Sequence, residues 1–160
     1  MDTAPRRSRR VREEPIRTHE GDIVSDYQVL TTTTTVTDDR TWLASLDGVH
    51  EAQTITVDTS KLTAATHYTP GTQNQPRHII KSGIPLGKIS ASGLYAPYNS
   101  AASDGTQILA GFLVAETAFT PGSTKTAGAL LWRGEVQASK LPVAFVPPAA
   151  ANTTAFIHYQ

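Results

Sequence analysis

The amino-acid sequence predicts a mainly β fold of the β-rich α+β kind: one compact β domain with short helical turns and an extended N-terminal arm. Apolar residues occur in short runs that are bounded by Gly, Pro, Asn and Asp, the residues that turn a chain. These runs are rich in residues of high β propensity and do not repeat with a helical period. Residues 1–37 differ in composition, being basic and then Thr-rich, so we expect an arm over 1–37 and a β-rich domain over 38–160.

Length and composition limit the functional classes. A chain of 160 residues can form one domain with a core and an extension. Its 14 basic and 14 acidic residues balance, so the whole chain has no electrostatic bias toward nucleic acid or membrane. Without cysteine it has no disulfide, thiolate metal site or Cys nucleophile. No apolar run approaches the length of a membrane span, and the basic start lacks the apolar stretch of a signal peptide, so we expect a soluble protein without a targeting segment.

The first part of the arm, residues 1–17, carries six arginines and almost no apolar residue. Such a segment cannot offset its ordering entropy by burial, so we expect it to be disordered alone. It is either a solvated tail or an arm that docks on an acidic surface or on phosphates. A protein surface is favoured over nucleic acid, because no aromatic residues are interleaved for base stacking.

The second part of the arm, residues 21–37, is Thr-rich and has high β propensity around Val29, Leu30 and Val36. No strong alternation determines which face would be buried. Two interpretations remain open: an extended linker, or a strand that pairs with an exposed sheet edge of a partner through main-chain hydrogen bonds.

The β domain opens with a small apolar group around Trp42, where Asp39 is a candidate cap for one helical turn. Trp42 is expected to be a core or subunit-interface anchor. Residues 52–58 alternate at Ile55 and Val57, which predicts a half-buried strand. Residues 59–77 collect Thr, Pro, Gly, Gln and Asn and predict a surface loop.

Three apolar segments follow between residues 79 and 114. Strands are expected at 79–80, within 84–89 and over 108–114. Asp104-Gly105 precedes the last segment, and its tolerance of positive φ predicts a tight reversal between strands.

The C-terminal third contains two further strand signals. Residues 117–127 predict a loop, and 128–136 an apolar strand broken at Arg133-Gly134-Glu135. The prolines of 141–148 exclude a central strand throughout that segment. One weak helical turn is expected within 149–154, and 156–159 reads as a terminal strand.

No motif for catalysis or metal binding is present. The five histidines show none of the i, i+2 or i, i+4 spacings of a local metal-ligand pair. The sequence has no nucleophile elbow, P-loop or dinucleotide fingerprint. No carboxylate is in a setting that would raise its pKa for acid–base work. We therefore expect neither an enzyme nor a cofactor or metal site.

Three ordered phrases carry a family resemblance: SGIPLGKISASGLYAPY, then SDGTQILAGFL, then GALLWRGEV with SKLPVAF. In this order they resemble the lambda D-like head-decoration proteins of tailed bacteriophages, a group of capsid-stabilising proteins. DDRTWLASLDGVHEAQTITVDTSKLTAATHY is similar to the N-terminal part of longer members from phages of actinobacteria. The resemblance covers residues 38–160, and each phrase alone is weakly specific. Before residue 38 the match is poor.

The resemblance implies a structural protein of the virion, made in the host cytoplasm and located on the outer surface of the mature capsid. Members bind there as trimers at threefold and quasi-threefold positions, and their N-terminal arm adds a strand to the major capsid protein. It therefore implies a homotrimer with the major capsid protein as partner, and no membrane partner. By region, the candidates for capsid contact are Val29, Leu30 and Val36, and those for core or trimer contact are Trp42, Leu94, Tyr95 and Trp132.

Two alternatives come from other classes. A nucleic-acid-binding module that uses the Arg-rich tail would bind less tightly as salt rises, and would fail without residues 1–17. A carbohydrate-binding module would need an aromatic platform, for which the tyrosines and Trp132 are too few and too dispersed in sequence.

Overall fold

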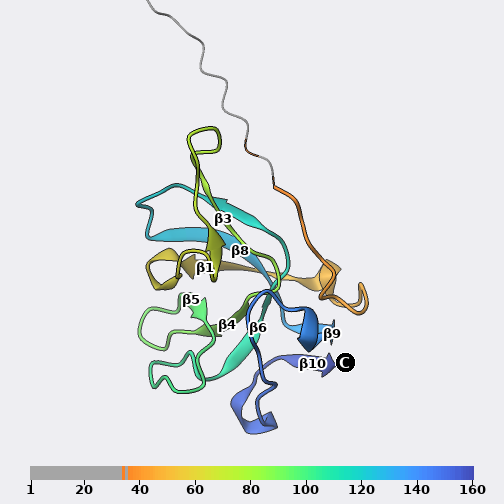
Figure 1. Cartoon of the computed structure of the whole chain (residues 1–160). Helices are drawn as coiled ribbons and strands as arrows, with labels where there is room; N and C mark the ends of the chain where they lie inside the picture. The colour runs from red at the N-terminus through yellow and green to blue at the C-terminus, as the bar shows by residue number, and fades with distance from the viewer. Residues whose placement is uncertain (1–33, 35) are drawn as a thin grey trace, which may run out of the picture. The chain divides into compact units, whose positions relative to one another are not determined.

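A computed structural model describes residue 34 and residues 36–160 (Figure 1). In this part of the chain short strands predominate, and the helices are single 3₁₀ turns, which confirms the predicted β-rich fold class. The predicted arm lies outside the described residues except at 34, 36 and 37. The strands are β1 (Gln53–Asp58), β2 (Tyr68–Thr69), β3 (His78–Ile80), β4 (Pro85–Lys88), β5 (Tyr95–Pro97), β6 (Leu109–Leu113), β7 (Thr117–Phe119), β8 (Lys125–Leu131), β9 (Arg133–Val136) and β10 (Phe156–Tyr159). The 3₁₀ turns are η1 (Val49–Glu51), η2 (Thr59–Lys61), η3 (Ala138–Lys140) and η4 (Ala150–Asn152).

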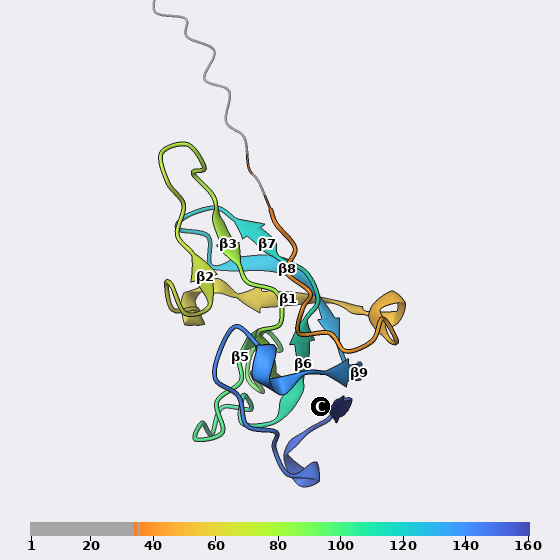
Figure 2. The ribbon, with the colours of Figure 1, turned by 45° about the vertical axis from the view of Figure 1, so that its right-hand side comes forward.

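Five strands close a small barrel in the order β1-β5-β4-β6-β8. The longest seam is antiparallel, between β1 and β8, and runs from the pair Gln53↔Leu130 to the pair Asp58↔Lys125. The ring closes through one parallel pair, Val57↔Tyr95. The views in Figures 1 and 2 show β4, β5 and β6 together on one side of β1 and β8.

Two smaller sheets accompany the barrel. The antiparallel sheet β2-β3-β7 lies next to β8 and β1, with β2 and β7 labelled in Figure 2. Strands β9 and β10 form a parallel pair at the C-terminal end of the chain. Because β9 follows β8 after the single residue Trp132, the chain leaves the barrel there and changes its partner strand.

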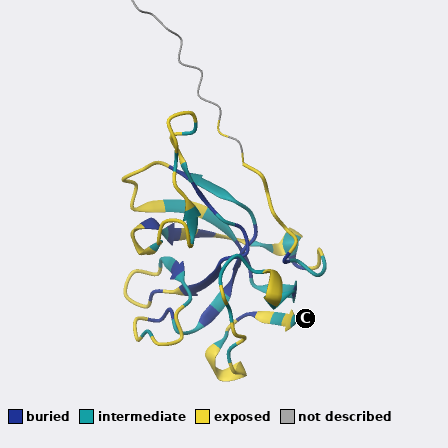
Figure 3. Ribbon diagram, in the orientation of Figure 1, coloured by how far each residue is buried: buried dark blue, intermediate teal, exposed yellow. Residues whose placement is uncertain are grey.

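The buried side chains form two clusters, and the dark segments of Figure 3 follow the strands that supply them. Alternation along β6 and β8 divides their residues: Leu113 and Leu130 enter one cluster, whereas Phe112 and Leu131 enter the other. Both faces of β6 and of the C-terminal end of β8 are therefore buried. The barrel cluster consists of Ile55, Val57, Ile80, Ile84, Leu86, Leu113, Phe119 and Leu130. The aromatic cluster consists of Trp42, Leu109, Phe112, Val114, Leu131 and Val136, with half-buried Tyr98, Phe145 and Tyr159 against it.

Several predicted elements are confirmed. β1 shows the expected alternation, with Ile55 and Val57 buried between exposed threonines. Strands occur at the three apolar segments of residues 79–114 and at 156–159, and η4 provides the expected turn within 149–154. No strand crosses 141–148, as the prolines predict.

Other predictions were wrong. Residues 117–127 are not one loop, because they contain β7 and the start of β8, and residues 59–77 contain η2 and β2. Asp39 accepts a hydrogen bond from the backbone N–H of Thr41 at 3.0 Å, but a turn follows it and not a helix. These short elements depend on partner strands that are distant in sequence, such as β3 for β7.

The predicted tight reversal at Asp104-Gly105 is also wrong. Residues 98–108 form a longer connection between β5 and β6. Gly105 does have positive φ, at 107°. Close approach of the backbone requires a glycine there, because a Cβ atom would come within 2.4 Å of the Lys88 carbonyl oxygen.

Candidate functional site: the root of the N-terminal segment and the exposed surfaces

Residues 38–44 fasten the beginning of the described chain to the fold. The backbone N–H of Gln137 donates to the carbonyl of Trp42 at 2.8 Å, and that of Ala44 donates to the carbonyl of Glu135 at 3.0 Å. These bonds lie along the edge of β9 that β10 does not occupy, and Leu43 forms a bridge with Val136 there. Residues 38–44 therefore form a fixed root, which anchors the beginning of the described chain to β9.

The indole of Trp42 is the centre of this root. Its Nε1–H donates to the Ser82 hydroxyl oxygen at 3.1 Å, and the Ser82 hydroxyl donates to the backbone carbonyl of Asp39. The ring lies 6.0 Å from that of Phe112, between centroids. Gly83 lies directly against the indole, where a Cβ atom would approach within 2.9 Å. Trp42 thus links residues 38–42 to the core and to the turn before β4.

Three carboxylates gather beside the root. The backbone N–H of Glu116 donates to Asp38 at 3.3 Å. Burial, and secondarily the charge of Asp38, raises the pKa of Glu116, whereas the backbone hydrogen bond from Thr41 lowers the pKa of Asp39. Repulsion within this group therefore increases as Glu116 ionises.

The predicted capsid-contact residues are mostly outside the described part of the chain. Val29 and Leu30 lie outside the described residues. Val36 is described and is 42% exposed, in an extended stretch just before the root. Its side chain is available at the surface.

The structure does not bring the four residues expected at the core or a trimer contact into one site. Trp42 is 1% exposed in the aromatic cluster. Tyr95, in β5, and Trp132, between β8 and β9, are half-buried and pack against the barrel cluster. Leu94 is half-buried immediately before β5. Trp42 serves the core, whereas Leu94, Tyr95 and Trp132 each keep part of their surface open to solvent.

A surface that sequence reasoning missed lies on the β9–β10 pair. Phe156 is 75% exposed and stacks edge-on against Trp132, with ring centroids 6.2 Å apart. The Trp132 indole N–H donates to the carbonyl of Glu51 at 3.0 Å, and Arg133 pairs with the carboxylate of Glu51 at 3.0 Å. Residues 156–159 alternate, and this pattern could have indicated that Phe156 lies on the outer face of a strand. The exposure of Phe156 could not be predicted, because it depends on whether another element covers β10.

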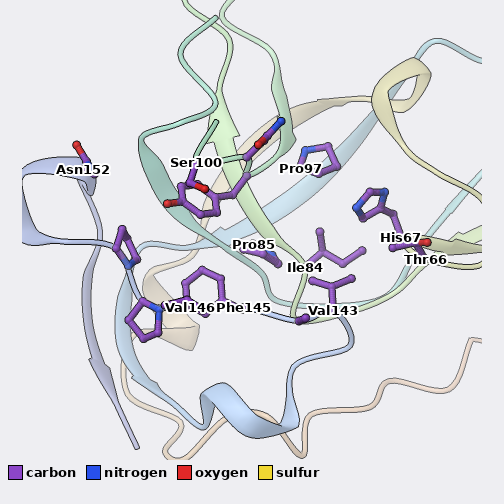
Figure 4. Close-up of a pocket in the computed structure, with 15 residues that line it drawn as sticks. Thr66, His67, Ile84, Pro85, Pro97, Ser100, Val143, Phe145, Val146 and Asn152 are labelled. Carbon is purple, nitrogen blue, oxygen red and sulfur yellow. The ribbon is translucent and has the colours of Figure 1, made fainter. Parts of the chain in front are cut away.

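A groove of about 660 Å³ lies between the barrel and the proline-rich segment 143–148 (Figure 4). Its lining is mainly apolar and aliphatic, with Tyr98 and Phe145 as its aromatic rings. The close-up shows His67 on one side and Asn152 on the other. The shape suits an extended apolar or amide-bearing ligand.

His67 is the titratable imidazole in the groove lining. Its Nδ1 accepts a hydrogen bond from the backbone N–H of Thr63 at 2.8 Å, so the neutral ring carries its proton on Nε2. Burial, and then the charge of Lys81, lowers the pKa of His67. The ring is therefore neutral near pH 7, and its Nε2–H can donate a hydrogen bond.

Within residues 36–160, no group of three or more His, Asp or Glu side chains is arranged to hold a metal ion. Among the described residues, no helix has the length and apolar character that crossing a membrane requires. Comparison with family models, with curated proteins and with solved structures finds no match to the chain in any of the three.

Proposed function

We propose that the chain is a head-decoration protein of a tailed bacteriophage, which binds the outer surface of the mature capsid and stabilises it. One observation carries the proposal. The phrases that resemble this family coincide with four of the five barrel strands: the first spans β4 and β5, the second covers β6, and the third covers the end of β8 and continues into β9, outside the barrel. The resemblance thus follows one connected structural unit in order.

The root of the N-terminal segment gives physical support. A decoration protein needs a rigid body and an arm that becomes ordered only on the capsid. The protein then binds the mature capsid lattice selectively, because only that lattice orders the arm. Trp42 and its hydrogen bonds hold residues 38–44 on the body, and Val36 is exposed just outside it. We propose that residues 1–37 supply the arm, and that Val29, Leu30 and Val36 contact the major capsid protein through strand addition.

We also propose that the protein acts as a trimer at threefold and quasi-threefold positions. A trimer has three arms that bind the capsid together, so contacts that are weak individually hold the trimer strongly on the capsid surface. Leu94, Tyr95 and Trp132 are the candidates for the trimer contact, because each is half-buried in the isolated chain. Alanine substitutions at these three residues that leave both the trimer and capsid occupancy unchanged would exclude them.

The test compares the full-length chain with residues 38–160, a deletion that keeps the Trp42 root. We expect light scattering to give a trimer for both forms, and only the full-length form to bind expanded empty capsids of the phage from which the chain comes. Monomers in both forms and no capsid binding would contradict the proposal. A trimer that is lost on deletion would instead show that the arm holds the subunits together.

The same two proteins distinguish the nucleic-acid alternative. Binding of full-length protein to DNA or RNA that weakens steeply with salt, without capsid binding, would support a nucleic-acid module. Removing residues 1–17 alone would then abolish that binding.

A further inference from the structure

The β9–β10 pair, which Figure 1 shows beside the C-terminus, presents an aromatic surface to solvent. Its outward side chains come from alternate residues of the two strands: Arg133 and Glu135 on β9, and Phe156 and His158 on β10. The Phe156 ring is 75% exposed and meets the half-buried Trp132 edge-on. Both rings line one hollow of about 420 Å³. An exposed aromatic ring in a hollow is a candidate docking surface.

This face has an excess of negative charge. Arg133 pairs with the carboxylates of Asp47, at 3.3 Å, and Glu51, at 3.0 Å. The side-chain amide of Gln160 donates to Glu135 at 3.2 Å, and within residues 36–160 no Lys, Arg or His side chain forms an ion pair with Glu135. In the part of the chain that the structure describes, three carboxylates are therefore set against one guanidinium on this face.

The carboxylates at the root are in a different setting. The side chains of Arg40, Lys81 and Lys140 lie beside them, the first in an ion pair and the other two in the lining of the same pocket. The negative charge of the root is thus balanced locally, whereas that of the β9–β10 face is not.

Arginine is the cationic side chain that suits such a face. Its planar guanidinium stacks on an aromatic ring and binds a carboxylate through two N–H groups, which a lysine ammonium cannot do. Residues 6–12 contain five arginines and no acidic residue, and Glu13 and Glu14 follow directly, so the positive charge is concentrated in this segment. The segment and the face are complementary in charge and in chemistry.

We propose that residues 6–12 of one copy dock on the β9–β10 face of a second copy, with a guanidinium on the Phe156 ring and its N–H groups directed to Glu135. Each copy carries one segment and one face, so the contact is head-to-tail and can close into a ring. The choice of a second copy rests on the proposed trimer, in which Trp132, part of this face, is a candidate for the subunit contact. Residues 13–37 can span up to about 80 Å, well beyond the ~30 Å diameter of a small domain, so the segment can reach a neighbouring subunit.

This contact adds to the proposed capsid role. Capsid contact is assigned to Val29, Leu30 and Val36, which lie outside residues 6–12. The arginines would connect subunits to each other, while the later part of the arm contacts the shell. Because the body supplies its own trimer contact, the arginine segment strengthens the trimer without being required for it.

Disulfide trapping tests the contact, because the chain contains no cysteine. Full-length Ser8→Cys/His158→Cys places one thiol within the arginine segment and the other on the face, and it keeps all five arginines. In the control, Ser8→Cys/Ser139→Cys, the second thiol lies in η3, which is next to β10 but does not line the hollow. With oxidised glutathione at low salt, the first variant should form covalent dimers and trimers at least ~5-fold faster than the control, because docking raises the effective concentration of the thiols. Non-reducing gels measure the rate, and peptide mass spectrometry identifies the linked residues.

Two further changes separate charge from proximity. In the first variant, Glu135→Gln should lower the rate at least ~2-fold, whereas Glu116→Gln at the root should leave it unchanged. Removing the Glu135 carboxylate would by itself favour the neighbouring thiolate and speed the reaction, so a slower reaction indicates weaker docking. In about 1 M salt, where the Debye length is about 3 Å, the rate should fall to that of the control.

Three results would overturn the proposal. They are equal rates for the two thiol pairs, equal effects of Glu135→Gln and Glu116→Gln, and disulfides that form within one chain and not between chains. Light scattering under reducing conditions separates this inference from the proposed trimer. A trimer that does not form the disulfide contradicts this inference alone, whereas a monomer contradicts both.

Discussion

At the scale of single residues, the contact between Gly83 and Trp42 is the most constrained point of the root. Gly83 has φ of 76°, and a Cβ there would press on the indole at 2.9 Å. We expect Gly83→Ala to lower the free energy of unfolding by about 2–4 kcal/mol, from backbone strain plus displacement of the ring. Denaturant unfolding followed by tryptophan fluorescence measures this change.

Gly122 provides the matched control. It has a similar φ of 82°, but a Cβ there would meet no atom within 4 Å. Gly122→Ala should therefore show the backbone term alone, about 1–2 kcal/mol. Equal losses in the two variants would show that the indole contact contributes nothing.

Ionisation of Tyr159, in β10, makes the stability of the fold depend on pH. Burial, and then the proximity of Tyr98, raises the pKa of Tyr159 from 10.0 to about 12. The folded state holds this proton more tightly than the unfolded state, so the stability contribution is full below pH 10 and is lost as pH rises through 12. We expect Tyr159→Phe to retain more of its neutral-pH stability than wild type between these pH values. Phenolate absorbance in the two proteins should differ by one late-titrating group, and a Tyr159 that ionises near pH 10 would contradict the prediction.

At the scale of elements, β1 shows how alternation determines a strand. Val57 is 1% exposed in the barrel cluster, whereas the neighbouring Thr56 points to solvent. Val57→Asn places an amide among apolar side chains and should lower the free energy of unfolding by about 3 kcal/mol. Thr56→Asn changes the outer face and should cost less than about 1 kcal/mol. Chemical denaturation measures both, and similar losses would contradict the assignment of faces.

Local sequence was sufficient for some elements and insufficient for others. β1 was predictable because its alternation is complete within six residues. β7 and β2 were missed because they are two or three residues long and depend on β3 for their hydrogen bonds. Residues 128–136 read as one broken strand, but the chain changes sheets at Trp132, and no local pattern marks a change of partner.

The candidate surfaces, too, were predictable from sequence only in part. The apolar character of Trp42, Tyr95 and Trp132 was visible in sequence, but their separation into a core anchor and partly open rings depends on the two clusters. Within residues 36–160, β10 pairs with β9 alone, and this was not predictable because the 156–159 pattern does not reveal whether a strand has one neighbouring strand or two.

At the scale of the whole molecule, the root at residues 38–44 marks where the folded domain begins to contribute to stability. Val36 and residues 37–41 are exposed, whereas Trp42 is buried and hydrogen-bonded. Deletion of residues 1–37 should change the free energy of unfolding by less than about 0.5 kcal/mol. Deletion through Trp42 should cost about 3–5 kcal/mol, since it removes a large buried side chain. Thermal or urea unfolding of the two truncated proteins checks this, and an equally large loss in both would contradict the position of the root.

Composition and local patterning were enough to establish a β-rich domain and its alternating strand β1, because propensity and alternation act within a few residues. The closed barrel, the division into two clusters and, among the described residues, the pairing of β10 with β9 alone required the tertiary structure. Each depends on pairs such as Val57↔Thr126 and Leu113↔Leu130 that join residues far apart in the chain. Many registers of such short strands satisfy the same local preferences, and the burial of β6 and of the C-terminal end of β8 on both faces selects one of them.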